Sequence, residues 1–338
     1  MNETISGKPS VRLIGATGKF LMNETLPVSD IEYHQGKVRM CQKRIFRYFG
    51  FYLPWPYKVA TKILNSLSAK GESSSASQSS VTFRYDGRRL SSMDLICILR
   101  EWGVEDGDTI MVHSSWDVLS PMMSSIREFL AGLLEAVGKT GTICMPVFPQ
   151  IKENDPNAVF SVMRTPSSSG IVTEMFRRMP GVKRSLQMRS VAAIGPNAEY
   201  LLRDHHKSPF ASGATSPYAR FADVGAKIIC LGVPATTNTM FHCGEDILQK
   251  LFPVSIYPAK PWSYSIADEN SQLLRVECFR MLWKWTFICD SKSILQYFDS
   301  ATIEYKDILG VECSLIHADR FLARLLALAK DGIHIYRL

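Results

Sequence analysis

A chain of 338 residues is long enough to bury a full hydrophobic core, and its content of 46% hydrophobic and 21% charged residues is typical of a globular protein. Its apolar runs fall well short of the roughly 18 residues that span a bilayer, and the N-terminus lacks the basic-then-apolar pattern of a secretory signal, so we expect a cytoplasmic protein. Much of the net charge of +7 comes from residues 36–71, which hold eight Lys or Arg and no acidic residue, and the near-neutral remainder gives no support for nucleic-acid binding.

The eight cysteines are scattered through apolar stretches, and none forms a C-x-x-C pair. Buried free thiols are therefore a better interpretation than disulfides or a zinc site. We expect no metal cofactor.

The first 80 residues differ in composition from the rest, and we predict a basic, aromatic extension at 1–80 ahead of one larger domain at 81–338. Within the extension, residues 40–66 interleave basic side chains with aromatic rings, a mixture typical of an arm at a membrane interface. An arm packed on its own domain or on a second subunit fits the same pattern, so peripheral contact with the inner face of the membrane and a homodimer both stay open. The serine-rich residues 68–80 predict a flexible linker.

Beyond the linker, apolar residues alternate between helical and strand periodicity. Ser92 can cap the first helix, and Ser125 with Glu128 form a capping box for the second. The predicted elements are a helix at 92–102, a strand at 108–113, a helix from 126 to 138, strands at 142–147 and 189–194, a helix at 170–179, a strand at 227–232, a strand pair across 262–288 and a last helix ending near 332. This order predicts an α/β fold with a mixed central sheet and helices on both faces.

One stretch near residue 240 carries a candidate for acid–base chemistry. The apolar run at 228–233 predicts a buried strand, and Asn238 or Thr239 can cap a following helix that extends to Leu251. His242 and Glu245 are three residues apart and share a helix face, so Glu245 can accept a hydrogen bond from the imidazole and hold one tautomer. That is the geometry of an oriented general base, although an ordinary surface pair fits the same spacing.

Seven stretches between about residues 90 and 330, in matching order and spacing, resemble the aminoglycoside 3-N-acetyltransferase family. They are Gly107-Asp108 with Val112-His113-Ser114-Ser115, Gly141-Thr142 with Met145-Pro146, Thr165-Pro166-Ser167 with Gly170, Gly181 with Arg184-Ser185, Ser190 with Ala193 and Gly195, Ser216-Pro217, and Leu231-Gly232 leading to Asn238-Thr239 and His242-x-x-Glu245. The resemblance implies an antibiotic N-acetyltransferase fold, distinct from the GNAT fold. It also implies transfer from acetyl-CoA to a primary amine of an amino sugar, which is the chemistry of antibiotic resistance.

That reaction assigns roles to the candidate residues. An ammonium group cannot attack a thioester, so a base must take its proton, and an imidazole, which titrates near pH 6.5, suits the task. We expect His242 to be this base and Glu245 to orient it. Backbone N–H groups around Ser114 and Ser115 are candidate donors to the thioester oxygen, although plain turn chemistry explains these serines equally well.

The resemblance favours a CoA-contacting loop at Ser114 and Ser115. It gives Thr165, Ser167 and Gly170 as second candidates for cofactor binding.

For several other histidines and cysteines, the sequence predicts a structural role. His113 lies inside an apolar strand, and we expect it to be hydrogen-bonded in the core. Cys243 adjoins His242, but consecutive helical residues diverge by about 100 degrees, so a Cys-His nucleophile is not expected. His205 and His206 beside Asp204 predict a polar loop, since no further metal ligand lies nearby in sequence.

Two departures from the family pattern bear on activity. The family carries His-Pro where this chain has Gln187-Met188, and its glycine-rich turn is replaced by residues 116–123. Lost glycines restrict how closely a pantetheine arm can approach the backbone. Two alternatives therefore stay open. The first is an N-acyltransferase that acts on a nucleotide- or lipid-linked amino sugar of surface-polysaccharide synthesis, which the basic arm favours. The second is an inactive membrane-associated binding protein with the same fold.

Overall fold

The computed structural model describes residues 88–151, 159–282, 285 and 288–336. The predicted extension at 1–80, with its arm at 40–66 and its linker, lies outside the described residues. Within the described ranges, no helix is both long enough and apolar enough to cross a membrane.

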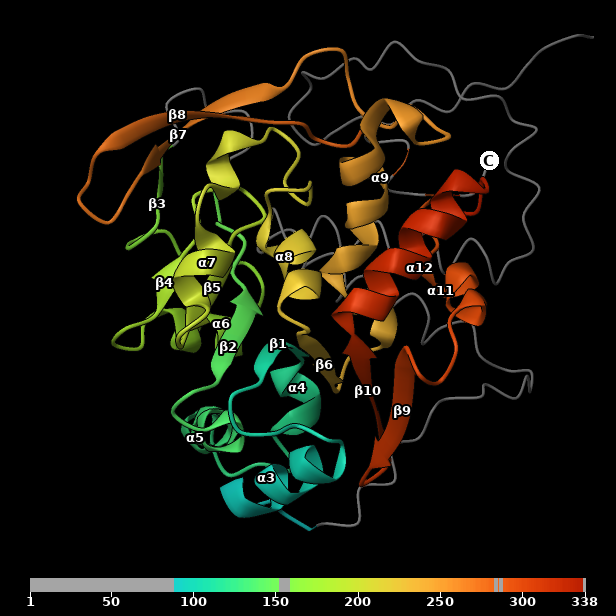
Figure 1. Cartoon of the computed structure of the whole chain (residues 1–338). Helices are drawn as coiled ribbons and strands as arrows, with labels where there is room; N and C mark the ends of the chain where they lie inside the picture. The colour runs from blue at the N-terminus through green and yellow to red at the C-terminus, as the bar shows by residue number, and fades with distance from the viewer. Residues whose placement is uncertain (1–87, 152–158, 283–284, 286–287, 337–338) are drawn as a thin grey trace, which may run out of the picture. The chain divides into compact units, whose positions relative to one another are not determined.

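A seven-stranded sheet forms the centre, in the order β4-β5-β2-β1-β6-β10-β9 (Figure 1). Its strands are β1 (Thr109–Ser114), β2 (Thr142–Pro146), β4 (Lys183–Arg184), β5 (Val191–Ile194), β6 (Lys227–Leu231), β9 (Ile303–Ile308) and β10 (Val311–His317). The central strand β1 is parallel to both neighbours, with Met111 opposite Cys144 of β2 and Ile228 of β6. The outer pairs are antiparallel. The predicted mixed sheet is therefore confirmed.

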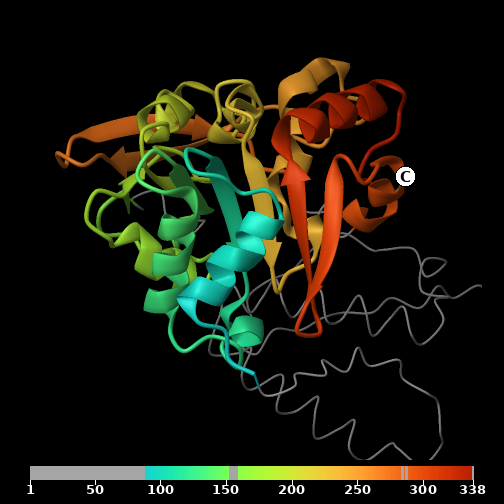
Figure 2. The same cartoon turned by 60° about the horizontal axis from the view of Figure 1, so that its bottom comes forward.

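Helices cover both faces of this sheet, because the buried strands are apolar on both sides. Ile110 and Val112 of β1 pack in one core layer, and Met111 packs in the other. The first layer is closed by α3 (Ser92–Glu101), α5 (Ile126–Val137) and α6 (Ile171–Arg177). The second is closed by α7 (Ala198–Leu202), α8 (Pro217–Asp223), α9 (Cys243–Leu248) and α12 (Ala318–Lys330). Figure 2 shows α3 and α5 lying across the near side of the sheet.

A second, three-stranded sheet carries its own small core. It consists of β3 (Val159–Ser161), β7 (Trp262–Ala267) and β8 (Leu273–Cys278), with β7 parallel to β3 and antiparallel to β8. Phe160, Tyr264 and Ile266 are almost fully buried there. The predicted strand pair across 262–288 is this β7–β8 hairpin, although β8 already ends at Cys278.

Local side-chain chemistry sets the helix ends. Ser125 caps α5 by accepting the N–H of Glu128 at 3.2 Å, and Gly138 ends it with a φ of 66°, as expected for a glycine stop. The predicted cap of α3 at Ser92 is wrong by one residue. Ser91 is the cap because its hydroxyl accepts the N–H of Asp94, whose carboxylate in turn accepts the Ser91 N–H at 2.9 Å.

Gln187 joins the two sheets. It lies between β4 and β5 with no exposed surface, and its amide nitrogen donates to the carbonyl of Ser208 at 3.0 Å. Its amide oxygen accepts the N–H of Met188 at 2.8 Å and the hydroxyl of Tyr264 on β7. At the position of the family's His-Pro, this chain thus has a buried glutamine, Gln187, whose side chain connects the two sheets in the protein interior.

Removing this link should lower stability. In Gln187→Ala, the Ser208 carbonyl and the Tyr264 hydroxyl lose a buried partner and a cavity opens, so we expect a loss of about 2–4 kcal/mol. Chemical denaturation at pH 7 measures it. The matched control, Gln272→Ala in the exposed β7–β8 turn, should change stability by less than about 0.5 kcal/mol. Equal, small losses in both variants would contradict the structural role of Gln187.

Candidate active site

The carboxyl ends of β1, β2 and β6 share one edge of the sheet, because these three strands run parallel. In open α/β sheets ligands bind at this edge. Ser114 ends β1 here and Ser115 follows it, and the chain leaving β6 leads to His242. The ends of β1 and β6 are tied together by the N–H of Ser115, which donates to the Leu231 carbonyl at 3.2 Å.

His242 lies at a break between two short helices. The predicted helix begins as a 3₁₀ turn, Thr239–His242, and Asn238 caps it by accepting the N–H of Met240 at 3.0 Å. His242 is then the N-cap of α9. The prediction of one continuous helix to Leu251 is wrong, because α9 ends at Leu248 and the backbone of the next residue is left-handed, with a φ of 50°.

The predicted hydrogen bond between His242 and Glu245 is present. Imidazole Nδ1 lies 2.6 Å from Oε1 of the carboxylate. The His242 side chain is 24% exposed, whereas that of Glu245 is only 1% exposed. The ring can therefore meet a ligand while its carboxylate partner stays out of water.

Electrostatics fixes the tautomer of the ring. Burial by itself raises the pKa of Glu245, but the charge and hydrogen bond of His242, with a hydrogen bond from Tyr336, outweigh it and lower that pKa. An ionised carboxylate can only accept a hydrogen bond, so Nδ1 must carry the proton. The lone pair of Nε2 is then available to take a proton from a substrate.

A second buried carboxylate, Asp246, follows Glu245 directly. Its oxygens accept the N–H of Ser212 at 2.7 Å and the hydroxyl of Tyr257. Burial and the neighbouring Glu245 charge raise the pKa of Asp246 to about 6, against the opposing charge of Arg189. Asp246 therefore anchors the base-bearing helix to the chain near Ser212. The sequence shows Glu245 and Asp246 side by side, but it does not predict that both side chains are buried.

Several buried polar groups lack a hydrogen-bond partner among the described residues, and those near the strand ends include the hydroxyl of Ser114, the amide nitrogen of Asn238, Nε2 of His113 and the hydroxyl of Ser314. Buried polar groups are nearly always paired, so such groups point to a ligand or water. By contrast, the backbone N–H of Ser115, expected to be a free donor, is taken by Leu231. Sequence reasoning considered Asn238 only as a helix cap and missed its free amide.

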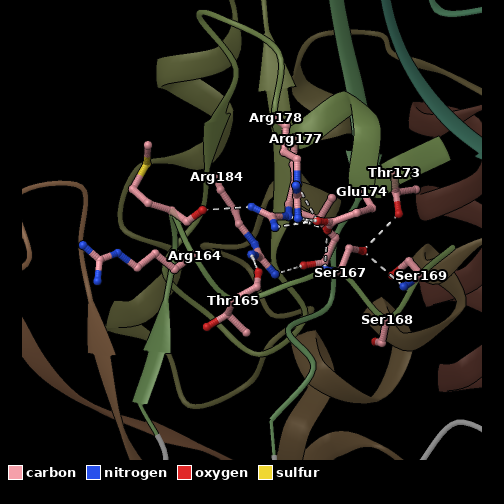
Figure 3. Close-up of polar contacts among 12 residues, drawn as sticks. Arg164, Thr165, Ser167, Ser168, Ser169, Thr173, Glu174, Arg177, Arg178 and Arg184 are labelled. Atoms are coloured by element: carbon pink, nitrogen blue, oxygen red, sulfur yellow. Dashed lines mark hydrogen bonds and ion pairs between the residues drawn. The ribbon is translucent and has the colours of Figure 1, made fainter. Parts of the chain in front are cut away.

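The loop with the second set of predicted cofactor residues is organised around Glu174 of α6 (Figure 3). Its carboxylate accepts the N–H of Ser167 at 2.7 Å. It also accepts two hydrogen bonds from Arg177, at 2.6 and 2.7 Å, and one from Arg178 at 2.7 Å. Arg184 supports the loop from β4 by donating to the Thr165 carbonyl at 2.7 Å.

The hydroxyl groups of this loop are engaged within it. Thr165 Oγ1 accepts the N–H of Ser161 at 2.9 Å, and Ser167 Oγ lies 3.0 Å from Thr173 Oγ1. Gly170 precedes α6 with a φ of 110°, a conformation that favours glycine. A structural explanation therefore exists for Thr165, Ser167 and Gly170, and their role in cofactor binding stays a prediction.

Two further histidines, His113 and His205, are buried. His113 is buried, and burial lowers its pKa to about 4, but Nε2 lacks the expected hydrogen-bond partner among the described residues. The polar-loop prediction for His205 is wrong, because this ring is fully buried. Its Nε2–H donates to the Ala211 carbonyl at 2.7 Å, and Nδ1 lies 2.8 Å from the Ser185 hydroxyl.

Cys243 is also buried, and burial raises the pKa of its thiol well above the usual value. The described part of the chain contains no group of three or more His, Cys, Asp or Glu side chains placed to hold a metal ion.

The Glu174 cluster makes stability depend on pH. Burial raises the pKa of Glu174, but the hydrogen bonds from Arg177, Ser167 and Arg178 outweigh it and lower the pKa from 4.5 to about 2. The ionised carboxylate therefore stabilises the fold above about pH 4.5, and this contribution is lost as the pH falls towards 2.

We expect Glu174→Gln to lower the free energy of unfolding by about 1–2 kcal/mol at pH 7, with the difference from wild type shrinking below about pH 4. Denaturant titrations at several pH values measure this. Glu199→Gln, which breaks an exposed pair with Lys183, is the matched control and should have little effect. A Glu174 variant as stable as wild type at pH 7 would contradict the organising role.

Comparison with known proteins identifies the family of this chain. The sequence profile of the family described as aminoglycoside 3-N-acetyltransferase matches residues 111–327. Aminoglycoside N(3)-acetyltransferase IV from Salmonella sp is 34% identical over 152 residues, which cover 45% of this chain and 57% of that protein. The match thus spans less than two thirds of this relative.

Solved structures share the fold. AAC-IIIb in a binary complex with CoASH has a TM-score of 0.61 at 20% identity, covering 74% of this chain and 99% of that one. A histidine-to-alanine mutant of AAC(3)-IVa in complex with a gentamicin has a TM-score of 0.60 at 23% identity, covering 74% and 92%. At such identities the likeness shows the fold alone, and it confirms the predicted fold class.

The profile match extends over more than half of the sequence. The family that the resemblance implied is therefore confirmed. This chain belongs to the aminoglycoside 3-N-acetyltransferase family.

Proposed function

We propose that this chain transfers the acetyl group of acetyl-CoA to a primary amine of an amino sugar of the aminoglycoside type. The observation that carries the proposal is the His242–Glu245 pair, a partly exposed imidazole held at 2.6 Å by a buried carboxylate in a chain of this family. An imidazole so oriented is suited to general base catalysis.

The chemistry follows from the tautomer. The free amine attacks the thioester carbonyl, and a C–N bond forms as the carbonyl π electrons move to oxygen. Nε2 of His242 takes the proton that the attacking nitrogen sheds, while Glu245 stabilises the resulting imidazolium through Nδ1. Collapse of the tetrahedral intermediate breaks the C–S bond and releases CoA thiolate, to which the imidazolium can return the proton.

Ser114 and Asn238 support a binding role for the edge of the sheet. Each presents a buried donor with no partner in the described part of the chain, one at the last residue of β1 and one on the segment after β6. We assign to them hydrogen bonds with the acyl-CoA thioester or pantetheine, and Ser115 lines the same turn. Charge that develops on the thioester oxygen needs such fixed donors.

The basic arm of the sequence favours a second acceptor class, an anionic nucleotide- or lipid-linked amino sugar. Steady-state kinetics with acetyl-CoA should compare a kanamycin-like amine with an amino-sugar nucleotide. We expect turnover of the kanamycin-like amine. Turnover of the nucleotide alone would support the second acceptor class, and no CoA binding at millimolar concentration would contradict both.

Replacing the catalytic pair should separate its two roles. We expect His242→Ala to lower kcat by about 10²–10⁴-fold and Glu245→Ala by a smaller factor, with CoA affinity little changed, because both groups act mainly in the transition state. Isothermal titration with CoA and steady-state kinetics measure the two effects. His206→Ala, a partly exposed histidine outside the site, is the control. Equal activity of His242→Ala and wild type would contradict the mechanism.

We also propose that residues 81–338 form the acyltransferase unit and that residues 40–66 serve as a membrane or subunit arm. The profile match, which begins at residue 111, and the first described helix, which begins at Ser92, support this division. A chain of residues 81–338 should keep the kcat of the full chain. Loss of binding to anionic vesicles on truncation would favour a membrane arm, and a fall in oligomer mass would favour a subunit contact. Loss of the fold on truncation would contradict the division.

A further inference from the structure

Glu245 has a second partner at the far end of the described chain. The hydroxyl of Tyr336 donates to Oε1 at 2.6 Å, and this is the same oxygen that accepts Nδ1–H of His242. Tyr336 lies beyond residues 111–327, which the family profile matches. The buried carboxylate therefore receives one donor from its own helix and one from a segment 91 residues away.

Tyr336 is held in place independently of its hydroxyl. Its ring makes edge contacts with Trp285 at a centroid distance of 5.6 Å and with Phe252 at 6.1 Å. Its backbone forms a β-bridge with Cys289, and the whole residue is 3% exposed. The ring should therefore stay where it is when only the hydroxyl is removed.

We propose that Tyr336 is a positioning residue for the His242–Glu245 pair: its hydroxyl fixes the orientation of the carboxylate and withdraws charge from Oε1, which sets how strongly Glu245 holds the protonated imidazole. This inference rests on the proposed function, in which His242 is the base. The physical reason is that a hydrogen bond donated to a carboxylate stabilises its negative charge. A carboxylate stabilised in this way attracts the imidazolium less strongly.

Other charged and titratable groups also face this carboxylate. They are Cys243 and Asp246 on its own helix, Arg189 ahead of β5, Tyr257, Cys289 beside Tyr336, and His334, which lines a small cavity next to Glu245. Tyr336, in contrast, donates to the same carboxylate oxygen that His242 contacts. Its removal therefore acts on the pair directly, while the remaining groups are unchanged.

The test is Tyr336→Phe, which keeps the ring and removes the hydroxyl. The pair then binds its proton more tightly, so the rising limb of kcat/KM against pH should move up by about 0.5–1 pH unit, with KM changed less than about twofold. The His242 ring signal in an NMR titration, assigned by its absence in His242→Ala, should move by the same amount. Tyr297→Phe, at an exposed tyrosine, is the matched control.

Two outcomes would overturn the proposal: an unshifted pH profile with an unshifted NMR midpoint, or the same shift in the Glu245→Gln background, where no carboxylate charge remains to be modulated. A purely structural tyrosine would lower stability and leave both midpoints in place. The NMR titration needs no acceptor, so it tests Tyr336 even if wild type acetylates none of the amines supplied. That result would count against the proposed function alone.

Discussion

The hydrogen bond between His242 and the buried carboxylate of Glu245 is the interaction on which the rest of the site depends. A carboxylate with almost no exposure to water is stable as an anion only where donors surround it. The 3₁₀ turn capped by Asn238, the short helix α9 and the ring of Tyr336 each place one part of that surrounding. In the sequence the two residues are an ordinary histidine and glutamate three positions apart. In the folded chain the burial of Glu245 strengthens its interaction with the His242 imidazole and polarises that ring.

The two adjacent acidic residues on α9, Glu245 and Asp246, have different roles because they contact different partners. Glu245 and Asp246 are adjacent and both buried. Against the effect of burial, His242 and Tyr336 lower the pKa of Glu245, while burial and the Glu245 charge raise the pKa of Asp246 to about 6. Glu245 faces the base, and Asp246 holds the backbone near Ser212. One carboxylate is therefore suited to chemistry and the other to anchoring, and the same low-dielectric surroundings produce both results.

Features with a local cause could be predicted from the sequence. Strands β1, β2 and β6 are short apolar runs, and α5 carries its own cap and glycine stop, so their bounds were predicted to within one or two residues. The His242–Glu245 contact was predictable because helical periodicity alone brings the two residues together. The partners of Gln187, the engagement of the Ser115 N–H by Leu231 and the burial of His205 depend on strand register and on packing between distant segments. No periodicity in the sequence specifies those.

The separation of 91 residues between Glu245 and Tyr336 has a consequence for folding. Contacts of high sequence separation form only after a long stretch of chain has closed, and they slow folding relative to local contacts. Before the residues after α12 reach α9, the Glu245 carboxylate lacks the donor that Tyr336 provides. The reactive character of His242 is thus a product of the native topology, which brings together donors from segments far apart in the chain.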